Sequence, residues 1–504
     1  MFIREDASAG QSALPSGPYW GSHMSRNAAV ARTLSYLESG AFYGDLGRRI
    51  AIPTESQNPQ RDYELGHYLD EEMKPALEAL GFRCRVMNHP KSRAPFLYGE
   101  RIEGSGLPTV LGYAHGDVIR GLETHWKHGC SPWQLAKDDA AYYGRGVADN
   151  KGQHTINLAA LAAVLAERGR LGFNAKWLIE MGEETGSAGL RELCADNREL
   201  FAADVLIASD GPRLSAERPT IFLGSRGAYP IDLWINARDE SHHSGTWGGL
   251  LSNPAIELAH AISTIVGPKG QVRVPEWRPA DIPAALRRTL AECDMLAEPG
   301  DPVIDPNWGE PGLSPLEKVV AWCTFEILAI TAGTPENPIN AVPSRAWARG
   351  QLRFVTGIEP EKILPALRQH LDRHGFSNVE IAKGADEVFR PSRLDIDHPW
   401  VKWAAESILR TTGKRATVVP SLGGSLPNDV FSEGLGLPTL WVPHSHRGCL
   451  QHAPNEYLPI SIAREALQLM AGLYWDLGEL GAPIDGKRIE QVQVPPQRTV
   501  SKTF

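Results

Sequence analysis

The chain has 504 residues and a formal net charge of −9. Because one hydrophobic core rarely covers so long a chain, we expect two domains. The negative charge gives no electrostatic reason to bind nucleic acid or an anionic membrane surface. No apolar run in the sequence approaches the roughly 18 residues of a membrane-spanning helix, so the composition is that of a globular protein.

The six cysteines are scattered and form no C-x-x-C pair. Such spacing is typical of reduced thiols and favours a cytoplasmic protein. The N-terminus has no basic stretch followed by an apolar core, so no secretory signal is predicted. Residues 21–24 read Gly-Ser-His-Met, which is either a remnant of cloning or part of a natural tail. We therefore expect residues 1–24 to be a flexible tail outside the folded domains.

Helix and strand patterns alternate along the first part of the chain. Apolar residues recur at helical spacing over 26–38, 63–80 and 152–168. Short apolar runs that are typical of strands lie at 109–114, 175–181 and 204–208. Strands separated by helices indicate βαβ units, and therefore an α/β fold with a mostly parallel sheet. Ligands of such sheets gather beyond the carboxyl ends of the strands.

The pattern changes after Arg226. We expect strands and helices in a different order there, namely strands at 229–237, 346–356 and 377–383 and helices at 253–266 and 359–374. A proline-rich stretch with weak periodicity covers 268–315. An α/β pattern then returns with a helix at 398–411 and a strand at 438–443. The sequence thus predicts an inserted α+β domain at 228–390, between the two segments 25–227 and 391–504 of a discontinuous α/β domain.

Side chains that can bind metal follow the strand-like runs of the α/β domain. In YAHGDV (113–118), His115 and Asp117 project to the same side of an extended segment, so Asp117 can support His115 from behind. In GRGVADNKG (144–152), Asp149 can bridge two cations, because a carboxylate has two oxygens with four lone-pair directions. A plain helix cap is the alternative role of Asp149.

Three acidic residues follow the next two strands. Glu183 and Glu184 are adjacent and repel each other unless a cation or a proton intervenes. One of them can therefore bind metal while the other handles protons. Asp210 ends a strand in ASDGP, where a turn-forming aspartate is the alternative.

A second histidine comes from the C-terminal segment. His452 follows the last predicted strand, and His444 and His446 are rivals for the same role. The whole set divides into two zinc sites that share Asp149, each with one histidine and one terminal carboxylate. Nitrogen and oxygen ligands in that number leave a position for water and suit catalytic zinc.

These motifs, in this order, resemble those of the zinc-dependent exopeptidase and aminoacylase family that includes carnosinase, aminoacylase, carboxypeptidase G and succinyl-diaminopimelate desuccinylase. The resemblance covers nearly the whole chain from about residue 26 and is strongest to the carnosinase-like dipeptidase branch. Segments typical of that branch are RPTIFLGSRG (218–227), HSGTWGG (243–249), NAVPSRA (340–346), GGS (423–425) and HAPNE (452–456). The resemblance implies a zinc-exopeptidase-like catalytic domain, and it makes the inserted domain a lid and a dimerisation domain.

The resemblance also implies a role for each matching residue. His115 and Asp210 would bind one zinc ion, and Glu184 and His452 the other. Asp149 would bridge the two ions, next to a cis peptide bond with Asn150. Asp117 would orient His115, and Glu183 would be the general base.

The same resemblance places the remaining site residues in the inserted domain and in the GGS motif. His243 would reach into the active site of the partner subunit of a homodimer. The carboxylate end of the substrate would be bound by Asn340, Arg353, Gly424 and Ser425. The implied activity is hydrolysis of the amide bond of dipeptides or of N-acyl and other N-substituted amino acids, by a water that the metals activate. Cobalt or manganese would also fit these ligands.

Two segments depart from the family pattern. Ser421 and Leu422 replace a charged pair that often precedes GGS in dipeptidases, which shifts our expectation toward N-substituted amino acids. His125, His128 and Cys130 are interpreted as loop residues, with a second metal site as the alternative. Two other functions stay open, namely hydrolysis of another C–N or ester bond, and non-catalytic binding on the same fold.

Overall fold

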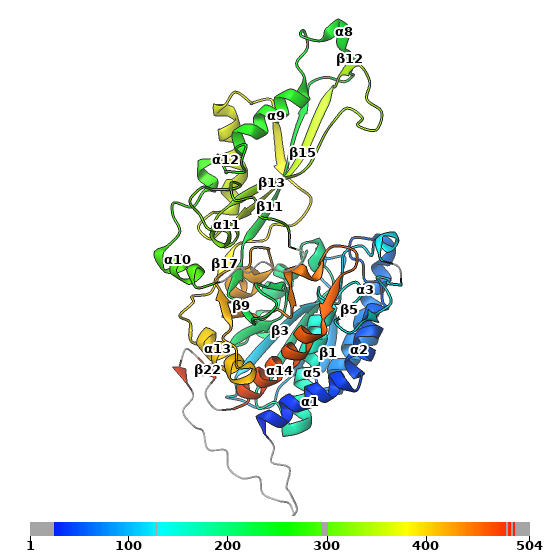
Figure 1. Ribbon diagram of the computed structural model, residues 1–504, viewed down its shortest axis with the longest axis vertical. Helices are drawn as coiled ribbons and strands as arrows, with labels where there is room; N and C mark the ends of the chain where they lie inside the picture. The colour runs from blue at the N-terminus through cyan, green and yellow to red at the C-terminus, as the bar shows by residue number, and fades with distance from the viewer. Residues whose placement is uncertain (1–24, 128, 294–300, 480–481, 485–486, 489–504) are drawn as a thin grey trace, which may run out of the picture.

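The computed structural model describes residues 25–127, 129–293, 301–479, 482–484 and 487–488 (Figure 1). The expected tail at 1–24 lies outside the described residues. Two sheets organise the chain, one in the lower part of Figure 1 and one in the part that projects above it. No helix in the described ranges is long and apolar enough to cross a membrane.

The lower part contains an eight-stranded mixed sheet. Its strands, in spatial order, are β1 (Arg83–Met87), β2 (Phe96–Arg101), β6 (Asn174–Glu180), β3 (Thr109–His115), β7 (Val205–Ala208), β19 (Thr439–Trp441), β9 (Thr220–Phe222) and β18 (Thr417–Val419). The pairs β6–β3, β3–β7, β7–β19 and β9–β18 are parallel, and the other pairs are antiparallel. The predicted α/β fold with a mostly parallel sheet is therefore confirmed.

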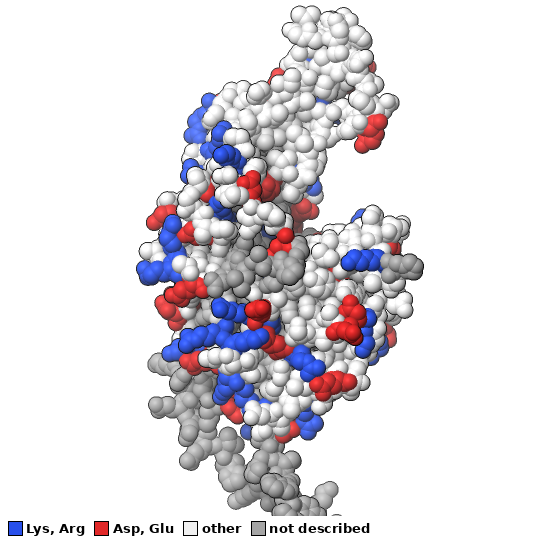
Figure 2. Space-filling view, in the orientation of Figure 1, with Lys and Arg blue, Asp and Glu red and all other residues white. Residues whose placement is uncertain are grey.

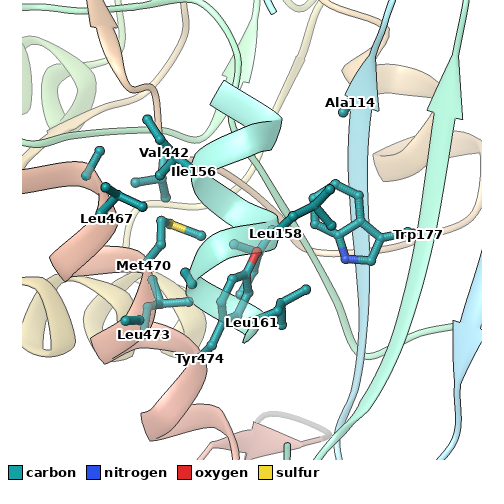
Figure 3. Close-up of a cluster of buried hydrophobic side chains, with 14 of the residues drawn as sticks. Ala114, Ile156, Leu158, Leu161, Trp177, Val442, Leu467, Met470, Leu473 and Tyr474 are labelled. Atoms are coloured by element: carbon teal, nitrogen blue, oxygen red, sulfur yellow. The ribbon is translucent and has the colours of Figure 1, made fainter. Parts of the chain in front are cut away.

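Helices cover both faces of this sheet. One face packs against α1 (Arg26–Glu38), α5 (Lys151–Arg168), α13 (Pro399–Thr412) and α14 (Ile460–Leu477). Figure 3 shows the centre of that layer, where Met470 and Leu473 of α14 point toward α5, and Leu158 of α5 lies beside Trp177 of β6. The other face packs against shorter helices, including α6 (Leu190–Asp196) and α11 (Pro315–Val320). Burial on both faces fixes the strand ends where the predicted ligands lie.

The upper part contains a four-stranded antiparallel sheet in the order β13 (Thr324–Ala332), β15 (Arg345–Phe354), β11 (Gly227–Asn236) and β16 (Glu380–Lys383). The helices α9 (Pro254–Ile265) and α12 (Pro360–Arg373) pack on this sheet. Asn253 caps α9 by accepting a hydrogen bond from Ala255 N at 3.0 Å, and Pro254 opens the helix, as its sequence predicts. A separate antiparallel domain is thus present, while its bounds at 228–390 stay a prediction.

The far tip of the upper part is formed by β12 (His242–His243), β14 (Ala341–Val342) and α8 (Ser244–Trp247) (Figure 1). Several elements had no counterpart in the sequence prediction, including β1, β2, β13, α14 and α2 (Ala41–Ile50). The helix expected at 63–80 is present as α3 (Asp62–Tyr68), a π-helical turn (Leu69–Met73) and α4 (Lys74–Ala79).

Candidate active site

His115 ends β3, and its side chain is fully buried. Nδ1 of the ring donates to the backbone oxygen of Asp117 at 3.0 Å and lies 3.4 Å from the Asp117 carboxylate. Nε2 points the other way, 3.1 Å from Asp149 Oδ1 and 3.4 Å from Asp210 Oδ2. The contact through Nδ1 leaves Nε2 as the atom that can bind a metal, as in other histidine ligands with a partner behind the ring.

Gly116 separates His115, the last residue of β3, from Asp117, which follows the strand. A Cβ on Gly116 would lie 2.6 Å from the Tyr68 ring, so only glycine fits here. Asp117 is fully buried, and its carboxylate accepts hydrogen bonds from the backbone N–H of Glu183 at 3.2 Å and of Glu184 at 3.1 Å. The carboxylate of Asp117 therefore fixes the turn that carries the two glutamates, while the backbone oxygen of the same residue holds the His115 ring.

Asp149 lies between two groups of potential metal ligands. Its Oδ1 faces His115, and its Oδ2 lies 3.3 Å from His452 Nε2. His452 Nε2 is also 3.0 Å from Glu184 Oε2. Within each group, His115–Asp149–Asp210 and Asp149–Glu184–His452, the ligand atoms lie within 4.8 Å of one another. The peptide bond between Asp149 and Asn150 is cis, as the family resemblance implies.

The charges at this site fit cations. Asp210 Oδ2 is buried and has no hydrogen-bond partner in the described part of the chain, so a cation would satisfy it. Hydrogen bonds to Asp149 and Glu184 raise the pKa of His452 to about 11. Burial, followed by the charge of Asp149, raises the pKa of Glu184 to about 7. Carboxylates at such short separations need compensating positive charge, and two divalent ions would supply it.

The rival histidines have other partners. The His444 ring is fully buried, with Nε2 2.9 Å from Ser209 Oγ and 3.0 Å from Asn157 Oδ1. His446 accepts a hydrogen bond from Gly448 N at 3.1 Å. The two groups around Asp149 are the metal-capable clusters of the described residues, and neither includes His125 or Cys130. His128 lies outside the described residues.

Glu183 lies beside the two groups on the wall of the cavity they share. Burial raises its pKa well above the usual value, and Asp210, Glu184 and Asp149 add to this increase, while His115 opposes it. Among the described residues, no side chain forms a hydrogen bond with its carboxylate. The Glu183 side chain is therefore available to a water or a substrate in the cavity.

The cavity has a volume of about 440 Å³ and reaches from the metal-capable groups to the upper domain. Arg353 of β15, Gly424 and Ser425 line it. Nη1 of Arg353 donates to Ser425 Oγ at 2.6 Å, and this hydroxyl donates to Arg226 O at 2.7 Å. The structure thus brings three of the predicted substrate-binding residues together on the wall of one cavity.

His243 and Asn340 do not line the cavity of their own chain. Both are exposed at the tip of the upper domain, where Ser244 N donates to Asn340 O at 2.8 Å and β12 pairs with β14 (Figure 1). The two predicted residues therefore lie next to each other, far from Arg353 in the same chain.

Comparison with known proteins agrees with this geometry. The profile of Peptidase family M20/M25/M40 matches residues 111–476, which is most of the chain. The chain belongs to this family. The human Beta-Ala-His dipeptidase is 35% identical over 402 residues, covering 74% of this chain and 75% of that protein. The Schizosaccharomyces pombe Cys-Gly metallodipeptidase is 31% identical over 472 residues, covering 87% of this chain and 96% of that protein.

Solved structures show the same fold. Human carnosine dipeptidase 1 superposes with a TM-score of 0.76 at 22% identity, over 90% of this chain and 99% of that chain. The expected resemblance to the carnosinase-like branch is confirmed, and the chain is a metal-dependent peptidase of the M20 family.

The M20 site also contains residues that the sequence motifs did not single out. Gln351, Asp386 and Glu387 line the cavity together with Leu422. Asp386 and Glu387 follow β16, and they are exposed. They belong to no recognisable motif. The one sequence signal for them is their position just after the strand predicted at 377–383.

Proposed function

We propose that this peptidase is a dinuclear zinc enzyme that hydrolyses the amide bond of dipeptides or of N-acyl and other N-substituted amino acids. The observation that carries the proposal is the position of Asp149, whose two carboxylate oxygens face His115 and His452. One ion would be held by His115, Asp149 and Asp210, and the other by Asp149, Glu184 and His452. The nitrogen and oxygen donors suit catalytic zinc, and cobalt or manganese would also fit.

Glu183 is the proposed proton carrier. Two bound zinc ions would supply an acidified water and positive charge for the amide oxygen. Glu183 accepts the proton of the attacking water on its carboxylate and returns it to the leaving nitrogen. Burial raises the pKa of Glu183 above its usual value, and a more basic carboxylate takes a proton from water more readily.

Arg353 is the proposed partner of the substrate carboxylate. A guanidinium can form two parallel hydrogen bonds with a carboxylate, and this geometry gives both affinity and orientation. In the structure Ser425 holds the Arg353 side chain at the cavity wall. Gly424 lies beside Ser425 and lines the same wall. This end of the cavity would therefore fix the C-terminal half of the substrate.

The residues that contact the other end of the substrate determine whether the enzyme accepts a free amino group or an acyl substituent there. Leu422 lines the cavity as an apolar side chain and cannot pair with an ammonium group. Asp386 and Glu387 line another part of the same cavity and can offer that charge. The names of the relatives, Beta-Ala-His dipeptidase and Cys-Gly metallodipeptidase, also support a substrate with a free amino group. A dipeptide is therefore the first substrate class to test.

We also propose a homodimer in which His243 and Asn340 enter the partner's cavity. β13 is an edge strand of the upper sheet, and Leu328 and Ile330 on it are 59% and 56% exposed. Exposed apolar edge strands readily pair with another chain. Figure 2 shows few charged side chains at the tip of this domain, as expected for a surface that another subunit covers.

A cytoplasmic location is part of the proposal. All six cysteines lie among the described residues, and no disulfide joins any two of them in that part of the chain. Free thiols are typical of proteins in a reducing compartment.

The proposed function is tested by a hydrolysis screen read by mass spectrometry. Zinc-loaded protein is incubated with dipeptides, N-acyl amino acids and N-carbamoyl amino acids, each with and without a chelator. We expect chelator-sensitive cleavage of dipeptides. Cleavage of the N-acyl panel alone would assign the pocket to N-substituted substrates. A metal-loaded protein that cleaves no member of the panel would contradict the proposal.

A further inference from the structure

Glu456 is a fully buried carboxylate next to the metal-capable groups. It comes four residues after His452, immediately before β21 (Tyr457–Pro459), which pairs with β5 (Ala141–Tyr143). Gly144 follows β5 directly, and its backbone N–H donates to the Glu456 backbone oxygen at 3.2 Å. The pairing of the two segments thus extends one residue further toward Asp149. The backbone of Glu456 is therefore fixed beside the loop that carries Asp149.

The Glu456 carboxylate binds that loop along its whole length. Oε2 accepts from Arg145 Nη1 and from Gly146 N, both at 2.9 Å. Oε1 accepts from Ala148 N at 2.8 Å and from Asp149 N at 3.0 Å. Four donors from residues 145–149 thus converge on one side chain, and the last of them is the backbone of the shared ligand itself.

The cost of this arrangement indicates that it has a specific role. Glu456 and Arg145 are both almost completely buried, and a buried ion pair contributes little to stability because both charges lose their hydration. Gly146 has a φ of 93°, which is unfavourable for other residues, so the loop needs a glycine at this turn. A buried ion pair that adds little stability is therefore expected where it holds a loop in one conformation.

We infer that Glu456 is a positioning residue for the metal centre: it fixes the Asp149 carboxylate between the two ligand groups and ties it to the segment that carries His452. This inference rests on the proposed metal site. The Asp117 carboxylate has the corresponding position on the other side, where it lies 3.4 Å from His115 Nδ1 and accepts from the backbone N–H groups of Glu183 and Glu184. The two buried carboxylates together would hold every proposed ligand segment except that of Asp210. Because Asp149 belongs to both groups, loss of Glu456 should weaken the binding of both ions.

The test is a metal titration of the apoprotein of Glu456→Gln against a chromophoric chelator, with zinc and with cobalt. Glutamine has the same size but places an NH2 group where two donors already point, so it should displace the loop. Changes to groups that orient metal ligands typically weaken metal binding by about 10–100-fold. We expect a loss of this size for both ions, together with a changed cobalt absorption spectrum.

The matched control is Asp476→Asn. Asp476 is also buried, forms an ion pair with Arg26 at 2.8 Å, and lies near the far end of α14, roughly 24 Å along the helix from its first residue at 1.5 Å per residue. This variant should lose stability but keep the metal affinity and cobalt spectrum of the wild type. A general effect of losing a buried ion pair would instead affect both variants alike and would overturn the inference.

The outcomes separate the inference from the proposed function. A wild type that binds no divalent ions contradicts the metal site itself. A wild type that binds two ions, together with a Glu456→Gln variant of equal affinity and spectrum, overturns only the role of Glu456. If Glu456→Gln is recovered unfolded, Glu456→Asp decides by the same titration, because it keeps the charge but withdraws the carboxylate by one methylene. Wild-type affinity in Glu456→Asp would then overturn the inference.

Discussion

The backbone N–H of Glu183 donates to the Asp117 carboxylate at 3.2 Å, and this contact fixes the glutamate beside the metal-capable groups. The Glu183 side chain is left for proton transfer. Glu183→Gln keeps the size of the side chain but cannot accept the proton. We expect kcat to fall by about 10²–10⁴-fold, the usual contribution of general acid–base catalysis, with two metal ions still bound.

Metal analysis and steady-state kinetics of the same Glu183→Gln preparation check this prediction. Glu184→Gln is the matched control, because it changes the neighbouring carboxylate, which is a proposed ligand. It should lose metal as well as activity. Normal turnover by Glu183→Gln would remove this residue from the mechanism.

Metal affinity should depend on pH. Hydrogen bonds to Asp149 and Glu184 raise the pKa of His452 to about 11, and burial raises that of Glu184 to about 7. The metal-free site therefore holds protons at neutral pH that must leave when metal binds. Each proton released makes the affinity about tenfold weaker for every pH unit of acidification.

The pH dependence is checked by competitive titration of zinc at about pH 6 and pH 8, with the pH dependence of the chelator itself taken into account. The sign is fixed: affinity rises with pH up to the raised pKa values. His452→Gln removes one of the titrating groups and should give a shallower slope. An affinity that is the same at both pH values would show that no proton leaves the site.

Arg353 should determine affinity for the substrate carboxylate. Hydrogen bonds to charged groups contribute about 1.5–3 kcal/mol, so Arg353→Ala should lower kcat/KM by roughly 10–100-fold. A substrate with an amidated C-terminus offers no carboxylate, and the variant should lose much less on it. Arg349→Ala is the control on the same strand, because Arg349 pairs with Asp232 at 2.8 Å instead. An equal loss on both substrates would assign Arg353 a structural role.

The sequence could predict which residues the fold brings together, because the proposed metal ligands follow strand ends in a parallel sheet. His115 ends β3, and Asp210 comes two residues after β7. The choice of His452 over His444 and His446 could not be derived from spacing, since it depends on which loop reaches Asp149. Glu456 lies within the HAPNE motif, but the motif does not predict its role, because three of its four donors are backbone N–H groups, which a sequence pattern does not reveal.

The elements that were missed have physical reasons as well. The second half of α14, from Leu469 to Leu477, is buried on all sides, so that half lacks the amphipathic stripe by which a surface helix is recognised. β13 is an edge strand with a register shift between Ile327 and Ala329, and most of its residues are exposed. The sequence of α14 therefore lacks a clear helical periodicity, and that of β13 lacks a clear alternation of polar and apolar residues.

The exposed edge of β13 should be the subunit contact. Ile330→Lys places a charge on this strand, and charged edge strands resist pairing. We expect the dimer to become monomeric in sedimentation velocity experiments, with the fold retained. Val86→Lys is the control, because Val86 is a partly exposed residue on β1, an edge strand of the other sheet. If Ile330→Lys remains as dimeric as the control, the contact lies elsewhere.

His243 should act in the partner's active site. It is exposed at the tip of the upper domain beside Asn340, and it does not line the cavity of its own chain. We propose that His243 stabilises the developing oxyanion in the partner's active site. Loss of one such group costs about 10²–10³-fold in kcat, so His243→Ala should be nearly inactive. Its metal content should be unchanged, because His243 belongs to neither ligand group.

Mixed dimers decide whether His243 acts across the interface. In a dimer of His243→Ala with Glu183→Gln, one cavity contains an intact Glu183 and receives an intact His243 from the other chain. Random assortment of equal amounts should restore about a quarter of the wild-type sites, since half of the dimers are mixed and each has one complete site. If the restored activity does not exceed the sum of the two inactive variants, His243 acts within its own chain or not at all. Restored activity that disappears when Ile330→Lys is added to both chains would tie the transfer of His243 to the β13 contact.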